Sequence, residues 1–161
     1  MINKNLKKIR LVVFDFDGVF TDNCVYVDEN GKETVKCTRA DGIGLKLIKS
    51  VGIEVIVLSM EKNNVVKERC KKLNINCVNG CENKLEVLKK IISSKGIHPN
   101  EVCYVGNDTP DIACMKYVGF PVAVKNSHSE VIKIAKHITK KKGGEGAVRE
   151  ICECIYKAKI E

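Results

Sequence analysis

The sequence predicts an α/β protein, a doubly wound parallel sheet of the Rossmann-like kind with a protruding β-hairpin. Short, nearly continuous apolar runs occur at residues 10–16, 53–58, 101–105 and 120–124, as expected for strands that are buried on both faces. Segments of helical spacing, about a dozen residues long, separate these runs, and that alternation is typical of parallel sheets. Ligands of such sheets bind at the carboxyl ends of the strands, so we expect the chemistry to follow these runs.

In the first half of the chain, turn residues separate the expected elements. Glu29-Asn30-Gly31 lies between two strand-like runs, and Asn-Gly in that position is a strong hairpin signal. Gly52 ends the helix that precedes it. The expected elements are a strand over 10–16, a hairpin over 24–37, a helix over 41–51, a strand over 53–58 and a helix over 63–73.

In the second half, apolar residues recur at helical spacing. Leu85, Leu88 and Ile92 share one helix face, and Gly96 ends that helix. A glycine-rich stretch precedes the C-terminal helix. The expected elements are a short strand near residue 77, a helix over 85–95, a strand over 101–105, a helix around 112–115, a strand over 120–124, a helix over 129–136, and a C-terminal tail and helix over 143–161.

The composition is that of one soluble domain over residues 1–161. The chain is 44% hydrophobic and contains no Trp, so we expect an aliphatic core. No stretch approaches the ~20 apolar residues that a membrane span needs. The N-terminus is basic but lacks the small-residue cleavage site of a signal peptide. We therefore expect a cytoplasmic protein with no membrane partner.

The nine cysteines predict neither a disulfide framework nor a zinc site. Their number is odd, and Cys70, Cys77 and Cys81 contain no Cys-x-x-Cys pair. Most cysteines lie within apolar runs, as Cys103 and Cys114 do. We therefore expect reduced side chains that pack as small hydrophobic groups.

The net charge of +8 does not indicate nucleic-acid binding. The lysines are spread along the chain, and only Lys140 to Lys142 form a run, without interleaved aromatic residues. A solvated basic surface that attracts an anionic substrate explains the charge with fewer assumptions.

Two aspartates follow the first apolar run. In Asp15-Phe16-Asp17-Gly18 the spacing of two puts both carboxylates on the same side, and Gly18 allows a sharp turn. Like charges this close repel, and a hard divalent cation such as Mg²⁺ would hold both ionised. A capped turn is the alternative, but it needs only one of the two acids.

Polar residues also follow the next two strands. Ser59 comes directly after the second strand, where a hydroxyl suits a phosphate, although a serine there also serves as an N-cap. Lys84 begins the following helix and can supply positive charge to the same phosphate. The third strand runs into residues 105–111, Val-Gly-Asn-Asp-Thr-Pro-Asp, and an Asx-turn explains only one of these polar side chains.

In this order the residues resemble the haloacid dehalogenase phosphatases. Asp-x-Asp-Gly-Val-x-Thr-Asp is the first motif of that family, and residues 15–22 match it throughout. By this resemblance Asp15 attacks phosphorus and becomes an aspartyl phosphate, while Asp17 protonates the leaving alcohol and then activates water. Ser59 and Lys84 would hold the phosphoryl oxygens.

The resemblance also implies Mg²⁺ as the cofactor, bound by Asp15, by the backbone carbonyl of Asp17 and by the acidic loop after the third strand. The family usually has Asp directly after the glycine of that loop, whereas this chain has Asn107. An amide oxygen is a weaker ligand, and Asp108 is the alternative. The third ligand therefore stays open between Asn107 and Asp108.

Many members of this family carry a cap domain, but this chain has no room for one. Only the hairpin and one helix separate residues 22 and 59, and one helix and one strand separate residues 84 and 107. The expected fold is therefore of the haloacid dehalogenase type without a cap. Such a site is open to water unless neighbouring subunits close it.

Three further stretches resemble the 3-deoxy-D-manno-octulosonate 8-phosphate phosphatase group. They are residues 39–44, 66–73 and 143–150, and the Gly-Gly-x-Gly-Ala-Val-Arg-Glu sequence of the last is specific. In that group four subunits assemble through the hairpins, and the tail of one subunit reaches a neighbour's site. The resemblance implies a homotetramer with Arg149 or the glycine-rich stretch near the substrate.

The second motif differs from the octulosonate enzymes, which usually have Gly-Arg where Met60-Glu61 stand. Glu61, with Arg69 and Lys72 on one helix face, is more similar to relatives that act on nine-carbon acids. These are phosphatases for sialic-type 9-phosphates and phosphatase-like domains of acylneuraminate cytidylyltransferases. Arg69 and Lys72 either pair with the sugar carboxylate or are solvated charges. The expected substrate is a phosphorylated sugar acid of eight or nine carbons.

Two other functions fit parts of the sequence. A receiver-type signalling domain also surrounds magnesium with acids, a hydroxyl and a lysine, but its phosphorylated Asp ends a middle strand, where this chain has Ser59 or Asn79. A catalytically weak regulatory or oligomerisation domain of the same fold is the second alternative. The departures at Met60 and Asn107 keep it open.

Overall fold

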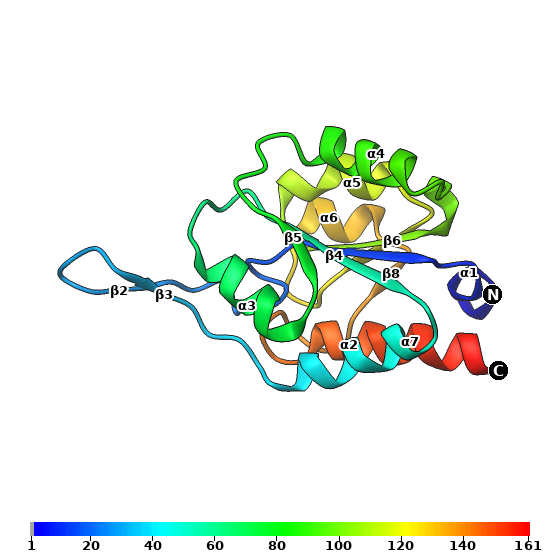
Figure 1. Cartoon of the computed structure of the whole chain (residues 1–161), viewed down its shortest axis with the longest axis horizontal. Coiled ribbons are helices and arrows are strands. Elements are labelled where there is room, and N and C mark those ends of the chain that lie inside the picture. The colour runs from blue at the N-terminus through cyan, green and yellow to red at the C-terminus, as the bar shows by residue number, and fades with distance from the viewer. Residues whose placement is uncertain (1) are drawn as a thin grey trace.

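The computed structural model describes residues 2–161, which form a six-stranded parallel sheet with helices on both faces (Figure 1). The strand order is β5-β4-β1-β6-β7-β8. The predicted α/β fold is therefore confirmed. The strands of the sheet are β1 (Leu11–Phe14), β4 (Glu54–Leu58), β5 (Asn76–Val78), β6 (Val102–Gly106), β7 (Phe120–Ala123) and β8 (His137–Ile138). The helices are α1 (Ile2–Lys7), α2 (Ala40–Ser50), α3 (Val65–Leu73), α4 (Lys84–Ser94), α5 (Ile112–Tyr117), α6 (Ser129–Ile134) and α7 (Ala147–Ile160), with 3-10 turns at Pro99–Glu101 and Thr109–Asp111.

Alternate residues of the central strand β1 face two separate cores. Leu11 and Val13 pack with side chains of α4, α5 and α6, whereas Val12 and Phe14 pack with side chains of α1, α2, α3 and α7. Figure 1 shows the same division, with α4, α5 and α6 above the sheet and α2 and α7 below it. Because both faces are buried, every residue of β1 is apolar, which accounts for the continuous run in the sequence.

Two short elements were not predicted from the sequence. Helix α1 lies in the basic N-terminal segment, and β8 pairs with β7 through only two residues, His137 and Ile138. Elements of this length give no periodic signal. Within residues 2–161, none of the helices is both long and apolar enough to span a membrane.

The predicted hairpin is present, but its paired strands are short. β2 (Tyr26–Val27) pairs with β3 (Glu33–Thr34), and the two project away from the sheet (Figure 1). In the turn, Asp28 Oδ1 accepts the backbone N–H groups of Asn30 and Lys32, each at 2.9 Å. Between residue 22 and β4 the chain forms only this hairpin and α2, so no cap domain is inserted there.

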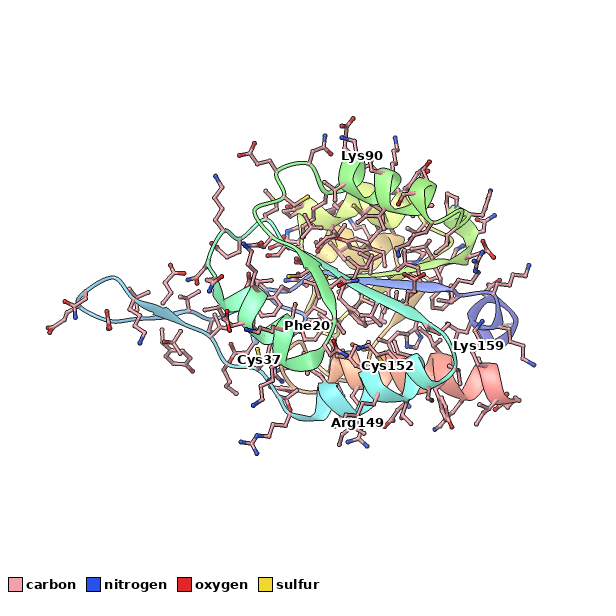
Figure 2. All side chains as sticks on the ribbon, viewed as in Figure 1. Phe20, Cys37, Lys90, Arg149, Cys152 and Lys159 are labelled. Atoms are coloured by element: carbon pink, nitrogen blue, oxygen red, sulfur yellow. The ribbon has the colours of Figure 1, made fainter. Side chains whose placement is uncertain are left out.

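Helices α2 and α7 lie unusually close together at Gly44. A Cβ added to Gly44 would lie 2.7 Å from Arg149 Cα and 3.0 Å from Cys152 Cβ, so only glycine fits between the helices. Figure 2 labels Arg149 and Cys152 on this side of the molecule. One turn earlier, Asp41 is fully buried and neither carboxylate oxygen has a hydrogen-bond partner. Burial raises the pKa of Asp41 to about 7, although the nearby Arg149 backbone and the Arg69 charge lower it.

We expect Asp41→Asn to stabilise the protein increasingly from pH 4 to pH 7. The folded carboxyl group holds its proton up to about pH 7, whereas the ordinary value is 3.8, so the native protein loses stability as pH rises through that range. The difference corresponds to at most ~4 kcal/mol at pH 8. Urea unfolding of both proteins at pH 4, 6 and 8 measures it. Asp28→Asn, on the exposed hairpin, is the control, and a pH-independent effect of Asp41→Asn would contradict the expectation.

Candidate active site

Side chains from three strand ends and from α4 meet in one pocket at the carboxyl edge of the sheet. Its volume is about 210 Å³. Eight of the residues singled out in the sequence line it, seven of them just after strand ends and Lys84 at the start of α4, as expected. The lining residues are Asp15, Asp17, Asn23, Ser59, Met60, Glu61, Lys84, Asn107, Asp108 and Pro110.

The loop after β1 is a tight, internally bonded turn that carries both aspartates. The carbonyl oxygen of Phe16 accepts the N–H groups of Val19 and Phe20, at 3.2 and 2.9 Å. Gly18 has a φ of +81°, a conformation that favours glycine, and its N–H donates to Thr21 Oγ1 at 3.0 Å. The loop therefore holds Asp17 in a defined place instead of leaving it on a mobile segment.

Lys84 joins two carboxylates in the floor of the pocket. Its side chain is only 4% exposed, and Nζ donates to Asp15 Oδ1 at 2.7 Å and to Asp111 Oδ1 at 2.9 Å. The hydroxyl of Tyr104, also buried, donates to Asp111 Oδ1 at 2.8 Å. One ammonium group thus neutralises one of two buried carboxylates, and the group retains a net negative charge.

Asp111 is a site residue that the sequence analysis did not single out. Its Oδ2 accepts the backbone N–H groups of Asn107 at 3.0 Å and Asp108 at 3.3 Å, so it shapes the loop as well as binding Lys84. A Cβ on Gly106 would lie 2.7 Å from Asp111 Cγ, which explains the glycine. The available signal was the second acid in residues 107–111, since the 3-10 turn at Thr109–Asp111 folds Asp111 back toward the strand end.

The ionisation of the two aspartates reflects the crowding of negative charge. Burial, followed by the charge of Asp111, raises the pKa of Asp15 to about 7 despite Lys84. Burial and then the charge of Glu61 raise the pKa of Asp17. Burial lowers the pKa of Lys84, but the charges of Asp15 and Asp111 outweigh it and the net pKa is raised. A further positive charge is needed to keep both aspartates ionised at neutral pH.

Three oxygen-bearing groups form what we call the oxygen cradle: Asp15 Oδ2, the Asp17 carbonyl and the side-chain amide of Asn107. The amide atom that faces the other two lies 3.1 Å from Asp15 Oδ2 and 3.0 Å from the Asp17 oxygen. Adjacent oxygens around octahedral Mg²⁺, with ligand distances of ~2.1 Å, lie ~3.0 Å apart. In one orientation of the Asn107 amide, its nitrogen donates to Asp15 Oδ2 and to the Asp17 carbonyl. In the other orientation, the amide oxygen faces these two oxygens, and all three can surround a cation. The cradle therefore fits Mg²⁺.

The cradle uses few acidic side chains. No cluster of three or more His, Cys, Asp or Glu suited to a metal occurs in the part of the chain that the structure describes. The cradle instead combines one carboxylate with a carbonyl and an amide. Asn107 is buried, whereas Asp108 is exposed and its Oδ1 accepts the N–H of Thr109 at 2.7 Å. Asn107 is thus the better-placed third group.

Ser59 and Glu61 form the second wall of the pocket. Ser59 is 1% exposed, and its Oγ accepts the N–H of Glu61 at 3.1 Å, which leaves the hydroxyl proton free to donate to a bound anion. Glu61 Oε1 accepts the N–H groups of Lys62 and Asn63. The carboxylate of Glu61 therefore stabilises its own loop and adds negative charge near Asp17.

Three residues expected near the substrate lie elsewhere in this chain. Arg69 and Lys72 line a separate pocket of about 400 Å³ together with Arg39 and Lys46, and Arg69 donates to the carbonyl of Thr38. Arg149 lines a third pocket, of about 530 Å³, and pairs with Glu153 at 2.7 Å. Figure 2 shows Arg149 on the opposite side of the sheet from Lys90 of α4.

Comparisons with known proteins address the family and the fold of the chain. The family model described as haloacid dehalogenase-like hydrolase matches residues 60–151. The 3-deoxy-D-manno-octulosonate 8-phosphate phosphatase of Escherichia coli (strain K12) is 36% identical over 153 residues, which are 94% of this chain and 81% of that protein.

Two solved structures of enzymes with the same name share the fold closely. The phosphatase of Moraxella catarrhalis, in complex with magnesium, phosphate and KDO, has a TM-score of 0.95 at 33% identity, over 99% of this chain and 92% of that one. The phosphatase of Yersinia pestis has a TM-score of 0.95 at 30% identity, over 99% of this chain and 86% of that one.

We expect Lys84→Met to destabilise the metal-free protein by roughly 3–5 kcal/mol at pH 8. The reason is that Lys84 is the only ion-pair partner of Asp15 and Asp111 among the described residues. Lys90→Met, at an exposed position of the same helix, is the matched control and should change stability little. Chemical denaturation in the presence of a chelator measures both. Equal, small effects of the two variants would show that the ion group contributes nothing to stability.

We expect saturating Mg²⁺ to raise the thermal unfolding midpoint and a chelator to reverse the effect. A ligand at 100 times its dissociation constant stabilises a folded protein by ~2.7 kcal/mol. Asn107→Leu should abolish most of this stabilisation, because it removes one oxygen of the cradle. Asp108→Asn should preserve it. The reverse ranking of the two variants would move the third ligand to Asp108.

Proposed function

The chain belongs to the haloacid dehalogenase-like hydrolases, and we propose that it is a phosphatase that cleaves the phosphate monoester of a 3-deoxy sugar acid. The observation that carries the proposal is the position of Asp15. One of its oxygens accepts a hydrogen bond from buried Lys84, and the other belongs to the oxygen cradle. A carboxylate held between an ammonium group and a cation site is well placed to attack a phosphate ester.

In the first step, Asp15 Oδ1 attacks phosphorus, since Oδ2 belongs to the cradle. The bond between phosphorus and the sugar oxygen breaks, and the leaving oxygen takes a proton from Asp17. Ser59 and Lys84 hold the phosphoryl oxygens during this transfer. Bound Mg²⁺ would supply positive charge against the transferring phosphoryl group.

In the second step, Asp17 takes a proton from water, which attacks the phosphorus of the aspartyl phosphate. The bond between phosphorus and Asp15 breaks, inorganic phosphate leaves, and the carboxylate of Asp15 is restored. Asp17 lies in the same pocket as Asp15 and has no ion-pair partner among the described residues, which suits a group that gives and takes a proton.

The identity of the sugar acid rests on two observations that favour different chain lengths. The curated relative from Escherichia coli is named for an eight-carbon substrate, 3-deoxy-D-manno-octulosonate 8-phosphate. Glu61 with Arg69 and Lys72, in contrast, resembles the enzymes that act on nine-carbon acids, and Glu61 lines the pocket. A sugar-acid phosphate is common to both, and its anionic groups match the positive net charge of +8.

We further propose that the enzyme is a homotetramer that assembles through its hairpins. Val25, Tyr26 and Val27 are 50%, 59% and 64% exposed, and a projecting apolar stretch of this kind is typical of an interaction surface. Arg69, Lys72 and Arg149 line other pockets of their own chain, so their predicted contact with substrate requires a neighbouring subunit.

The cysteines support a cytoplasmic location. All nine are unpaired, and most are buried or half-buried, as Cys103 and Cys152 are. Thiols in this number persist where the compartment is reducing. We therefore propose a cytoplasmic location.

The two alternative functions find less support. Membership of the hydrolase family gives the receiver-type domain no support. The catalytically weak domain was suggested by Asn107, but the amide of Asn107 completes the cradle with suitable spacing. Loss of turnover therefore does not follow from this substitution.

Phosphate release from eight- and nine-carbon 3-deoxy sugar-acid phosphates, with Mg²⁺ and with a chelator, tests the proposal. We expect Mg²⁺-dependent turnover of one of these substrates, and the preferred chain length identifies the acid. Absence of turnover on the whole panel, in a folded protein that binds Mg²⁺, would support the regulatory-domain alternative.

We expect Asp15→Asn to lower turnover of the preferred substrate by ~10³-fold or more, because the amide cannot form the covalent intermediate. Glu86→Gln, a comparable acid-to-amide change at an exposed position of α4, should stay close to the native rate. Circular dichroism checks that both variants fold. Native-like turnover by Asp15→Asn would end the assignment of Asp15 as the nucleophile.

A further inference from the structure

The segment between β8 and α7 lies against the loop that carries Asp17. We call residues 139–146 of this segment the strap. Gly143 and Gly144 of the strap are buried, and the N–H of Gly144 donates to the carbonyl of Val19 at 3.1 Å. A Cβ added to Gly143 would lie 1.7 Å from the carbonyl oxygen of Gly18. Strap and loop are therefore in backbone contact, and the contact leaves no room for a side chain.

Gly18 links Gly143 to the oxygen cradle. A Cβ added to Gly18 would lie 2.0 Å from Nδ2 and 2.6 Å from Cγ of Asn107, so these two residues are also in direct contact. Gly143, Gly18 and Asn107 therefore form an unbroken chain of contacts. Because Gly18 directly follows Asp17, a displacement of Gly18 turns the Asp17 carbonyl, which is one corner of the cradle.

The strap also contacts the loop after β7, and that loop in turn contacts Asn107, whose amide belongs to the cradle. The N–H of Gly143 donates to Asn126 Oδ1 at 3.0 Å. Two residues further along that loop, the N–H of His128 donates to the backbone carbonyl of Asn107 at 2.8 Å. The strap thus connects to the Asp17–Gly18 peptide on one side and to Asn107 on the other.

We infer that Gly143 is a positioning residue for the oxygen cradle, because it holds Gly18, and with it the Asp17 carbonyl, at the spacing from Asn107 that suits Mg²⁺. This inference rests on the proposed function, since it concerns the metal of that reaction. Gly143 can hold this position because it has no side chain. A methyl group there either moves Gly18 toward Asn107 or lifts the strap from the loop, and both movements displace the carbonyl.

Gly143→Ala tests the inference. Gly143 does not have the positive φ of Gly144, so a Cβ produces strain through contact alone. We expect the Mg²⁺ dissociation constant, measured by calorimetry, to rise roughly 10- to 100-fold, the range found for groups that orient metal ligands. The Mg²⁺ concentration for half-maximal hydrolysis of an aryl phosphate should rise by the same factor. Unchanged Mg²⁺ affinity in folded Gly143→Ala overturns the inference.

Gly44→Ala is the control for general destabilisation. Its Cβ would lie 2.7 Å from Arg149 Cα, between α2 and α7, so the variant loses stability without touching the cradle. We expect it to keep native Mg²⁺ affinity. If Gly44→Ala lost as much Mg²⁺ affinity as Gly143→Ala, general destabilisation would explain both losses. That result would also overturn the inference.

Asn126→Ala carries the test if Gly143→Ala does not fold. It removes the hydrogen bond that holds Gly143 and leaves the strap backbone unchanged, and Asn126 is exposed. Mg²⁺ affinity should fall in this variant too, and native affinity would overturn the inference.

Mg²⁺ binding by the native protein distinguishes failure of this inference from failure of the proposed function. If it binds no Mg²⁺, the proposed function fails as well, whereas native binding with equally tight binding by the variants removes only the role of Gly143.

Discussion

The two hydrogen bonds of Lys84 are the interaction on which the site depends. A charge buried without a partner loses several kcal/mol of solvation, so Lys84, Asp15 and Asp111 are tolerated in the pocket floor only because of one another. Asp111 extends the group further, since it also accepts the backbone N–H of Asn107. The ion group therefore ties β1, α4 and the loop after β6 into one unit. Its uncompensated negative charge favours a cation in the proposed oxygen cradle.

The topology of the sheet explains why these residues meet. β1 is flanked by β4 and β6, both parallel to it, and Phe14 lies in register with Val57 on one side and Val105 on the other. The next residues along each strand are Asp15, Leu58 with Ser59, and Gly106 with Asn107. Because both faces of β1 are buried against helices, the strand ends form a rigid platform. A reaction that needs groups held within fractions of an ångström is well served by such a platform.

The elements best predicted by the sequence are those in which two-sided burial or a motif constrains the residues. The buried strands, the hairpin and the pocket residues from Asp15 to Asn107 were expected in their observed places. Asp111 was missed because its role depends on a 3-10 turn that no periodicity reveals. Strand β8 was missed because two residues give no pattern. Arg69 and Arg149 are half-buried residues of α3 and α7, and charge alone does not say which pocket a side chain lines.

The contact between Gly18 and the strap has a consequence for how the protein is made. Gly18, in the loop of Asp17, leaves the ribosome before Gly143. The two residues are 125 positions apart, the difference between 143 and 18. At translation rates of about 5–20 residues per second, that separation corresponds to roughly 6–25 s. During this interval the nascent chain carries Asp15 and Asp17 without the segment that completes their surroundings. If Gly143 positions the oxygen cradle, as we infer, a nascent chain that ends before the strap lacks part of the support of its cradle, so Mg²⁺ binding depends on synthesis of the strap as well as of the Asp17 loop.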